Sequence, residues 1–242
     1  MPSSIRLKYA TTQSFAVGGV PGGVTYTYVR AKVRNLAFEK HVAVHFRGLS
    51  AEAWLNMDLN WVAHYGTHDI FGRDGGFATN EFVVFATQGG VTAFDNNSGA
   101  NYHVGSNQSL VGGNVALHRA VARQGIQGGG GFIFQTSWFE GEIYVQNLNF
   151  AKRIGVRHTV DGWATVADAE ASYVGPVAEG VYAGGVGAEL WQFRTPELNL
   201  NPVSPVFEFA VFYQRLDTGE MFWDNNFGLN YRLSKMSGAT VE

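Results

Sequence analysis

Residues 95–102, with the sequence DNNSGANY, recur as residues 224–231, with the sequence DNNFGLNY, and six of the eight positions are identical. A second pair lies upstream in the same order: residues 33–40, VRNLAFEK, correspond to residues 145–152, VQNLNFAK. Two motifs kept in the same order in both halves of a chain indicate a duplicated domain. The repeated residues are asparagine, aromatic residues and glycine, which suit the recognition of a neutral polar ligand better than bond breaking.

The repeat predicts two domains, residues 1–108 and 109–242, joined by a polar, glycine-bearing linker near residues 106–113. A chain of 242 residues is long enough for two domains of this size. The second copy is longer, chiefly through residues 197–205, which are rich in proline and asparagine and are predicted to form a loop. The first copy has diverged more in its middle third.

Composition excludes several classes of protein. Charged residues make up 15% of the chain and the net charge is −3, so nothing favours binding to nucleic acid or to an anionic membrane. There is no cysteine, hence no disulfide, no thiolate metal site and no cysteine nucleophile. The sequence shows neither a signal peptide nor a membrane-spanning apolar run, so we expect a cytoplasmic location by default.

Hydrophobic periodicity predicts an all-β fold. Apolar and polar residues alternate in short runs, which are residues 5–9, 26–29, 42–46, 115–118, 132–134 and 206–212. Glycine-rich breaks separate these runs. Many short strands with regular turn signals are typical of an antiparallel β-sandwich. Residues 50–65 alone have a helix-like pattern, although their two tryptophans fit a strand and loop equally well.

The DNNxGxNY motif has two interpretations. Glycine permits a tight turn, the asparagine amides can pair with vicinal hydroxyls of a sugar, and the preceding aromatic residue (Phe94 or Trp223) can stack on a pyranose ring. Alternatively, the asparagines hydrogen-bond the backbone of their own turn and serve only the fold. Duplication does not decide between the two, because a fold-determining turn would be repeated as well.

Tryptophan and lysine residues provide further candidates. Trp163 follows a turn at Asp161-Gly162 and is either a stacking surface or a buried core residue. Trp54 aligns with Trp163 in the first copy, although Trp61 competes for that alignment. Lys40 and Lys152 occupy one position of the repeat, where a solvated strand lysine is the simpler interpretation.

Four stretches together give a specific resemblance: VQNLNFAKRI at 145–154, DGW at 161–163, FEFAVFY at 207–213 and WDNNFGLNY at 223–231. In this order they resemble carbohydrate-binding module family 21, the starch- and glycogen-binding domains of fungal glucoamylases and of glycogen-targeting subunits of protein phosphatase 1. The resemblance covers residues 142–233. The N-terminal half keeps residues 33–44 and 94–102 but lacks the DGW turn.

The resemblance implies two tandem immunoglobulin-like antiparallel β-sandwich domains that bind α-1,4-glucan. It also implies which residues contact the sugar, and we expect these to be Trp163, Trp223, Asn225, Asn230 and Lys152 in the second copy and Trp54, Phe94, Asn96, Asn101 and Lys40 in the first.

No catalytic motif or repeated pair of carboxylates indicates an enzyme, and no residue pattern indicates a metal or a cofactor. We therefore expect a non-catalytic protein whose partner is a polysaccharide, with avidity from the tandem modules. Two alternatives stay open. One is a glycogen-targeting scaffold in which one module binds a protein partner, and the other is binding of a different glucan, such as a β-1,3-linked one.

Overall fold

The computed structural model describes residues 4–49, 53–129, 132–177, 186–199 and 205–242. Within these residues every long element is a β-strand, the sheets are built from antiparallel pairs, and the helical elements are single turns of 3₁₀ helix. The chain divides into two compact units. The first comprises Met1–Asn114 and Pro176–Ala188, and the second comprises Val115–Gly175 and Glu189–Glu242.

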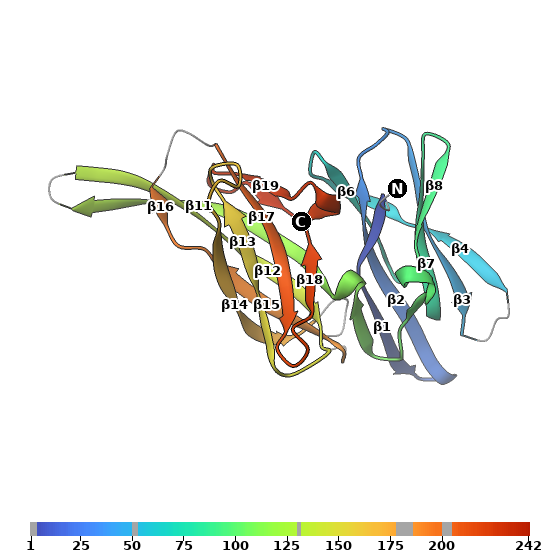
Figure 1. The fold of residues 1–242 in the computed structure, drawn as a ribbon. Coiled ribbons are helices and arrows are strands. Elements are labelled where there is room, and N and C mark those ends of the chain that lie inside the picture. Colours follow the sequence, from blue (N-terminus) through green and yellow to red (C-terminus); the bar gives the residue numbers. More distant parts are fainter. Residues whose placement is uncertain (1–3, 50–52, 130–131, 178–185, 200–204) are drawn as a thin grey trace. The chain divides into compact units, whose positions relative to one another are not determined.

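The first unit contains two sheets, with strand orders β10-β1-β2-β6-β5 and β4-β3-β7-β8, and β9 pairs with β7 (Figure 1). Its elements are β1 (Ile5–Val17), β2 (Val20–Arg34), β3 (Lys40–Gly48), β4 (Trp54–Asp58), β5 (Asn60–His64), β6 (His68–Asp74), β7 (Thr79–Gln88), β8 (Val91–Asp95), η1 (Asn97–Gly99), β9 (Tyr102–His103), β10 (Gln108–Val111) and η2 (Gly112–Asn114).

The core of the first unit lies between these sheets. Alternate residues of β1 and β2, such as Leu7 and Val29, face alternate residues of β3 and β7, such as Val44 and Phe82, and all are buried. This is the period of two that the alternating runs predict, because successive side chains of a strand point to opposite faces.

The second unit is built on one continuous sheet with the order β18-β17-β13-β14-β15-β12-β11-β20, to which β16 and β19 add at β12 and β17. The long hairpin of β11 and β12 extends past the neighbouring strands of its unit (Figure 1). Its elements are β11 (Val115–Gly129), β12 (Phe132–Gln146), β13 (Lys152–Thr159), β14 (Ala167–Pro176), β15 (Ala188–Arg194), β16 (Leu198–Asn199), β17 (Val206–Arg215), β18 (Met221–Asp224), η3 (Asn226–Gly228), β19 (Tyr231–Ser234) and β20 (Thr240–Val241).

Aromatic rings form the core of the second unit. The ring of Phe139 on β12 lies 4.7 Å from that of Phe209 and 4.9 Å from that of Phe207, both on β17. His158 on β13 contacts Phe139 edge-on at 5.6 Å and is only 4% exposed. Neither ring nitrogen of His158 has a hydrogen-bond partner among the described residues.

His158 makes the stability of the second unit depend on pH. Burial lowers the pKa of His158 below its usual 6.5, although the Asp168 carboxylate opposes this shift. Below about pH 6.5 the unfolded chain therefore binds more protons than the folded one, and the free energy of unfolding falls by up to about 1.4 kcal/mol per pH unit. We expect urea denaturation to show this decline between pH 7 and 5, and His158→Phe to remove it. The exposed His103→Gln should keep it, and an unchanged slope in His158→Phe would contradict the assignment.

Three expectations are refined by the strands. Residues 54–58 and 60–64 are β4 and β5, which resolves the helix-like pattern of this region in favour of strands. The predicted linker contains β10, which pairs with β1 from Tyr9↔Val111 to Thr12↔Gln108. The expected loop at 197–205 contains β16, and residues 200–204 lie outside the described part of the chain.

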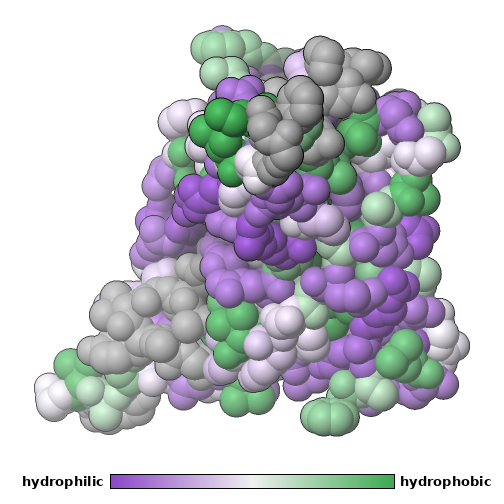
Figure 2. Space-filling view, turned by 90° about the vertical axis from the view of Figure 1, so that its left-hand side faces the viewer, coloured by the Kyte–Doolittle hydropathy of each residue, from purple (hydrophilic) through white to green (hydrophobic). Residues whose placement is uncertain are grey.

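Hydrophilic side chains cover most of the molecular face in Figure 2, and hydrophobic ones lie there in small scattered groups. No helix in the described residues is long and apolar enough to cross a membrane.

Candidate functional site

The loop after β18 has an unusual backbone that its asparagines stabilise. Asn226, Phe227 and Asn230 have φ of 50°, 61° and 58°. Asparagine tolerates this left-handed region because its short side chain hydrogen-bonds locally. The Oδ1 of Asn225 accepts from the N–H of Gly228 at 3.0 Å, and the Nδ2 of Asn226 donates to the carbonyl of Asn230 at 3.0 Å.

A buried aspartate anchors this loop. The Oδ2 of Asp224 accepts from the N–H of Leu117 at 3.0 Å and from the hydroxyl of Tyr231 at 2.6 Å. The loop at 95–102 uses the same bonds, because the Oδ2 of Asp95 accepts from the N–H of Leu7 at 2.7 Å and from Tyr102 at 2.8 Å. The aspartate, the second asparagine and the tyrosine of the motif thus all serve the loop itself, as the structural interpretation of the motif expects.

Some amide groups of the motif remain unused. Among the described residues the Nδ2 of Asn225 and the side-chain amide of Asn230 find no protein partner, and both side chains are half-buried. In the first unit the Nδ2 of Asn101 donates to the Oε1 of Glu81 at 2.9 Å, and Asn96 is exposed and accepts from Gly99. The second loop therefore offers more free hydrogen-bonding capacity than the first.

Trp223 lies at the edge of the sheet, against a phenylalanine ring and an arginine. It is opposite Phe212 on β17, with ring centroids 5.6 Å apart. The guanidinium of Arg157 lies 5.5 Å from the centre of the Trp223 ring. The Nε and Nη2 of Arg157 donate to the two carboxylate oxygens of Asp168 at 2.7 and 2.8 Å. Arg157 holds the pKa of Asp168 below its usual value, so the carboxylate stays charged and this support stays rigid.

Trp163 is held in the turn between β13 and β14. Gly162 and Trp163 have φ of 67° and 72°, and the indole N–H donates to the Oε2 of Glu208 at 2.9 Å. Asp161 closes the turn, because its carboxylate accepts from the hydroxyl of Thr159 at 2.7 Å and from the N–H of Thr165 at 2.9 Å. The turn thus fixes an indole that is only half-buried.

The ionisation of Asp161 determines how the turn that holds Trp163 responds to pH. Hydrogen bonds from the side chain and backbone of Thr165 and from Thr159 lower the pKa of Asp161 from 3.8 to about 2. The carboxylate therefore supports the turn at every pH above about 4, and this support is lost as the pH falls from about 4 to about 2.

For the Asp161→Ala variant we expect a sugar affinity about threefold to tenfold lower, with little change in melting temperature, and Asp161→Asn should be milder because it keeps an acceptor. Wild-type affinity should be constant between pH 8 and 5 by isothermal titration calorimetry. An affinity that falls between pH 6 and 5 would show that another group controls the site.

Strand register brings the two tryptophans to one face. Phe212 and Glu208 are four residues apart on β17, so they point to the same side and lie about 13 Å apart along the strand. Trp223 is opposite Phe212, and Trp163 is bonded to Glu208. Residues 225–230 connect β18 to β19 along this interval. We call Trp163, Trp223, Asn225 and Asn230 the edge site.

Lys152 lies away from the edge site. It pairs with Arg215, whereas Thr159, near Trp163, pairs with Glu208, so the two positions are about 23 Å apart along β13. The Lys152 side chain is 3% exposed, and its ammonium group contacts the Oε2 of Glu189 and the Oδ1 of Asn147, both at 2.8 Å.

Two aromatic residues near Lys152 escaped the sequence analysis. The indole N–H of Trp191 donates to the Oε2 of Glu189 at 2.9 Å. Phe150, two residues before Lys152, is 99% exposed. Glu189 and Trp191 could not be paired with Lys152 from sequence, because they are 37 or more residues away on β15. Phe150 could have been found from the sequence, since the repeat keeps a phenylalanine at this position in both copies.

The first unit has a related cluster at Lys40. Its ammonium group contacts the Oδ2 of Asp69 at 2.8 Å and the Oδ1 of Asn35 at 2.9 Å. Burial raises the pKa of Asp69, but hydrogen bonds from Lys40 and His64 outweigh it and hold the pKa below its usual value. Phe38 and Trp61, which are 99% and 60% exposed, line the same cavity of about 780 Å³.

The remaining predicted residues of the first unit lie on its second sheet. Trp54 is in β4 opposite Arg47 and stacks on His45, with ring centroids 4.8 Å apart. It therefore occupies a strand, whereas Trp163 occupies a turn. Phe94 is in β8 opposite Phe85 and is about half exposed. Among the described residues no group of three or more His, Asp or Glu side chains is arranged to hold a metal ion.

Comparison with known proteins gives a match in the second half of the chain. Residues 131–234 match the model of the carbohydrate/starch-binding module family 21, which is less than half of the chain. The chain is 34% identical over 100 residues to glycogen-binding subunit 76A of Drosophila melanogaster, covering 41% of this chain and 13% of that protein. It is 33% identical over 93 residues to protein phosphatase 1 regulatory subunit 3C of Bos taurus, covering 38% and 27%. The match thus spans a small part of these relatives.

Among solved structures, the starch-binding domain of Rhizopus oryzae glucoamylase, in complex with β-cyclodextrin and maltoheptaose, is 24% identical with a TM-score of 0.31 and covers 50% of this chain and 92% of that one. All residues of the edge site and of the Lys152 cluster fall within the matched residues. Residues 131–234 are one module that matches carbohydrate-binding module family 21.

Proposed function

We propose that the second unit binds an α-1,4-glucan such as glycogen or starch, without catalysis, at the edge site. The observation that carries the proposal is the side-chain amide of Asn230, which finds no partner among the described residues, in a loop that runs from the strand of Trp223 toward the strand position of Glu208, the partner of Trp163. The relatives named as glycogen-binding and the family named for starch support the choice of glucan.

The chemistry follows from the groups that the loop leaves unused. The indole faces of Trp163 and Trp223 replace water against the apolar faces of two glucose rings. The Nδ2 of Asn225 and the amide of Asn230 then hydrogen-bond hydroxyls between them. Because a bent α-1,4 chain presents successive rings at an angle, two separately oriented indoles suit it better than a flat platform would.

Lys152 takes part in a second contact surface of the same unit. Its ion pair with Glu189 is nearly buried, so the ammonium group serves chiefly to orient the Glu189 and Asn147 side chains. The fully exposed ring of Phe150 supplies the stacking surface beside them. The two surfaces lie about 23 Å apart along β13, so each is proposed as a separate contact with glucan.

The first unit is proposed as a diverged tandem copy, with the domains at residues 1–108 and 109–242. The matching loop hydrogen bonds of Asp95 and Asp224 support this proposal. Its ligand contacts would be Phe94, Asn96, Asn101 and Trp54 on one sheet and Lys40 in the other cluster. Two weak sites on one polymer raise apparent affinity by about 10²–10⁴ when both engage.

Affinity electrophoresis tests the function. The wild type and the Trp163→Gly/Trp223→Ala variant are run in gels containing glycogen, amylopectin, laminarin or no polysaccharide. Glycine is chosen at position 163 because it accepts a φ of 72°. We expect retardation by the two α-glucans, reduced in the variant and kept in a Phe134→Ala control on the β12 hairpin. Retardation by laminarin alone would mean that the ligand is a β-1,3-glucan and not an α-1,4-glucan. No retardation in any gel would refute glucan binding.

A protein partner is the second candidate, as in a glycogen-targeting scaffold. It is favoured by the relatives named as regulatory subunits of protein phosphatase 1 and by the complete exposure of Phe38 in the first unit. A Phe38→Ser variant that keeps glycogen retardation but loses co-purification of a phosphatase catalytic subunit would support the scaffold.

A further inference from the structure

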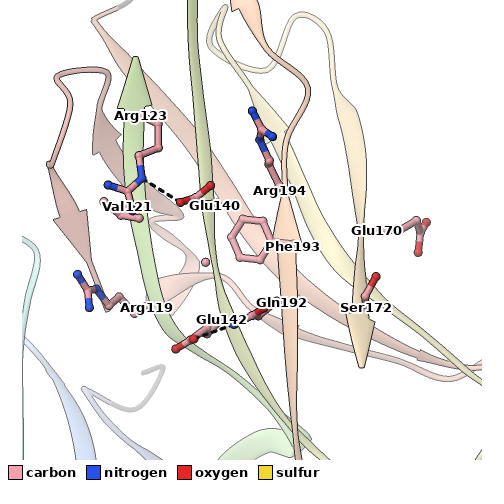
Figure 3. Close-up of a pocket in the computed structure, with 11 residues that line it drawn as sticks. Arg119, Val121, Arg123, Glu140, Glu142, Glu170, Ser172, Gln192, Phe193 and Arg194 are labelled. Carbon is pink, nitrogen blue, oxygen red and sulfur yellow. Dashed lines mark hydrogen bonds and ion pairs between the residues drawn. The ribbon is translucent and has the colours of Figure 1, made fainter. Parts of the chain in front are cut away.

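A polar groove lies on the second unit across β11, β12, β15 and β14, which are neighbours in the sheet. It has a volume of about 630 Å³. Its lining side chains come from all four strands, with Arg119 and Glu170 at its two margins in Figure 3. None of the edge-site residues lines it.

One row of side chains crosses the four strands. Arg119 on β11 is opposite Glu142 on β12. The Nε2 of Gln192 on β15 donates to the Oε1 of Glu142 at 3.1 Å, as Figure 3 shows, and Ser172 lies on β14. The row thus carries a guanidinium, a carboxylate and an amide on three neighbouring strands, which lie about 4.8 Å apart, and a hydroxyl on the fourth. In the described part of the chain the guanidinium of Arg119 donates to no acceptor.

A second row runs beside the first. The Nε of Arg123 donates to the Oε1 of Glu140 at 2.9 Å, and this bond keeps the pKa of Glu140 below its usual value. The guanidinium of Arg194 lies 4.7 Å above the ring of Trp138. Glu140 therefore remains an ionised acceptor at neutral pH, and Arg194 offers a flat, delocalised surface over the indole.

The balance of positive and negative charges in the groove favours an uncharged ligand. Three arginines and three glutamates line it, so it attracts neither an anion nor a cation strongly. The lining has few exposed apolar groups, since Phe193 is 4% exposed. What remains is a dense array of donors and acceptors that cross-strand bonds have already ordered. Such an array can pair every hydroxyl of a neutral polyol while losing little side-chain entropy.

We propose that this groove binds a neutral oligosaccharide chain, which lies across the strands with its hydroxyls on Arg119, Glu142, Gln192 and Ser172. The proposal rests on the proposed function for the choice of an α-glucan, but its site is separate. The groove gives the second unit a binding surface in addition to the edge site, and this surface depends on hydrogen bonds instead of indole stacking.

The test uses the full chain with the edge site removed by Trp163→Gly/Trp223→Ala. Maltoheptaose is titrated into this variant, and binding is followed by ¹H–¹⁵N chemical shifts of the groove backbone. We expect residual binding with shifts at Gln192 and Ser172, weakened at least fivefold by adding Gln192→Ala or Arg119→Ala. Adding Gln135→Ala, an exposed amide on the β12 hairpin, should change nothing. Both groove residues are exposed, so the fold should survive their replacement.

The outcomes separate this inference from the proposed function. If the wild type binds maltoheptaose and the edge-site variant does not, the groove proposal is overturned and the proposed function stands. If the two bind equally and Gln192→Ala abolishes binding, the groove stands and the edge site falls. An affinity for maltoheptaose that drops steeply between 50 and 500 mM NaCl would also overturn the groove proposal, because salt does not screen the binding of a neutral ligand.

Discussion

Replacing Asp224 by alanine is expected to lower the free energy of unfolding of the second unit by about 3–5 kcal/mol. Asp224 is 4% exposed, and its Oδ2 is the acceptor for both the N–H of Leu117 and the hydroxyl of Tyr231. The change removes the carboxylate that both donors share, at a place where water cannot replace it. It also releases the loop that carries Asn225 and Asn230. Urea denaturation followed by ¹H–¹⁵N signals measures the two units separately.

Asp95→Ala is the matched control. Asp95 makes the corresponding bonds to Leu7 and Tyr102 but is more exposed, so water can replace part of what is lost. We expect a smaller loss of about 1–2 kcal/mol, confined to the first unit. Equal losses in the two variants would mean that burial does not determine the strength of this anchor.

Trp223→Ala is expected to weaken binding of maltoheptaose by about tenfold to a hundredfold. The indole is already oriented by Phe212 and by the Arg157–Asp168 pair, so its contribution carries little ordering cost. Trp223 is only half-buried, so the second unit should stay folded. Isothermal titration calorimetry gives the affinity, and the near-ultraviolet circular dichroism of the remaining tryptophans gives the fold.

Phe94→Ala removes the ring at the corresponding edge position of the first unit. There the ring packs on Phe85, with ring centroids 5.5 Å apart, and His45 and Asn56 occupy the cross-strand positions that correspond to Arg157 and Asp168. We expect Phe94→Ala to lower affinity for maltoheptaose less than Trp223→Ala does. A folded Trp223→Ala variant with wild-type affinity would remove this residue from the site.

The strands could be predicted because runs of β-branched and aromatic residues bounded by turn signals leave a direct trace in the sequence. Residues 42–46 and 206–212 are such runs and both lie in strands, β3 and β17, although residues 42–44 and 209–212 are buried on both faces. The role of residues 108–111 left no such trace. Strand β10 has only four residues, and its pairing with β1 and its bridge to Val186 join positions far apart in the sequence.

The candidate site was only partly visible in the sequence, because contacts across strands depend on register. Lys152 and Trp163 are close in sequence, yet they lie near opposite ends of β13. The asparagines were recognised, but sequence cannot show that the side-chain amide of Asn226 is bonded within its own loop while that of Asn230 has no partner among the described residues. Trp54 and Trp163 align in the repeat because both are tryptophans, but they lie in different structures. Trp54 is the first residue of strand β4, whereas Trp163 lies in the turn before β14.

If Trp163 stacks on glucan as proposed, its left-handed backbone sets stability and ligand recognition against each other at a single position. Its φ of 72° suits glycine or asparagine, and a bulky residue there carries strain of about 1–3 kcal/mol. A library of all substitutions at position 163 should therefore give two opposite rankings, with glycine and asparagine high when variants are selected for thermal resistance and low when they are selected on glycogen. An evolutionary lineage that stopped using the ligand would be expected to lose this tryptophan early.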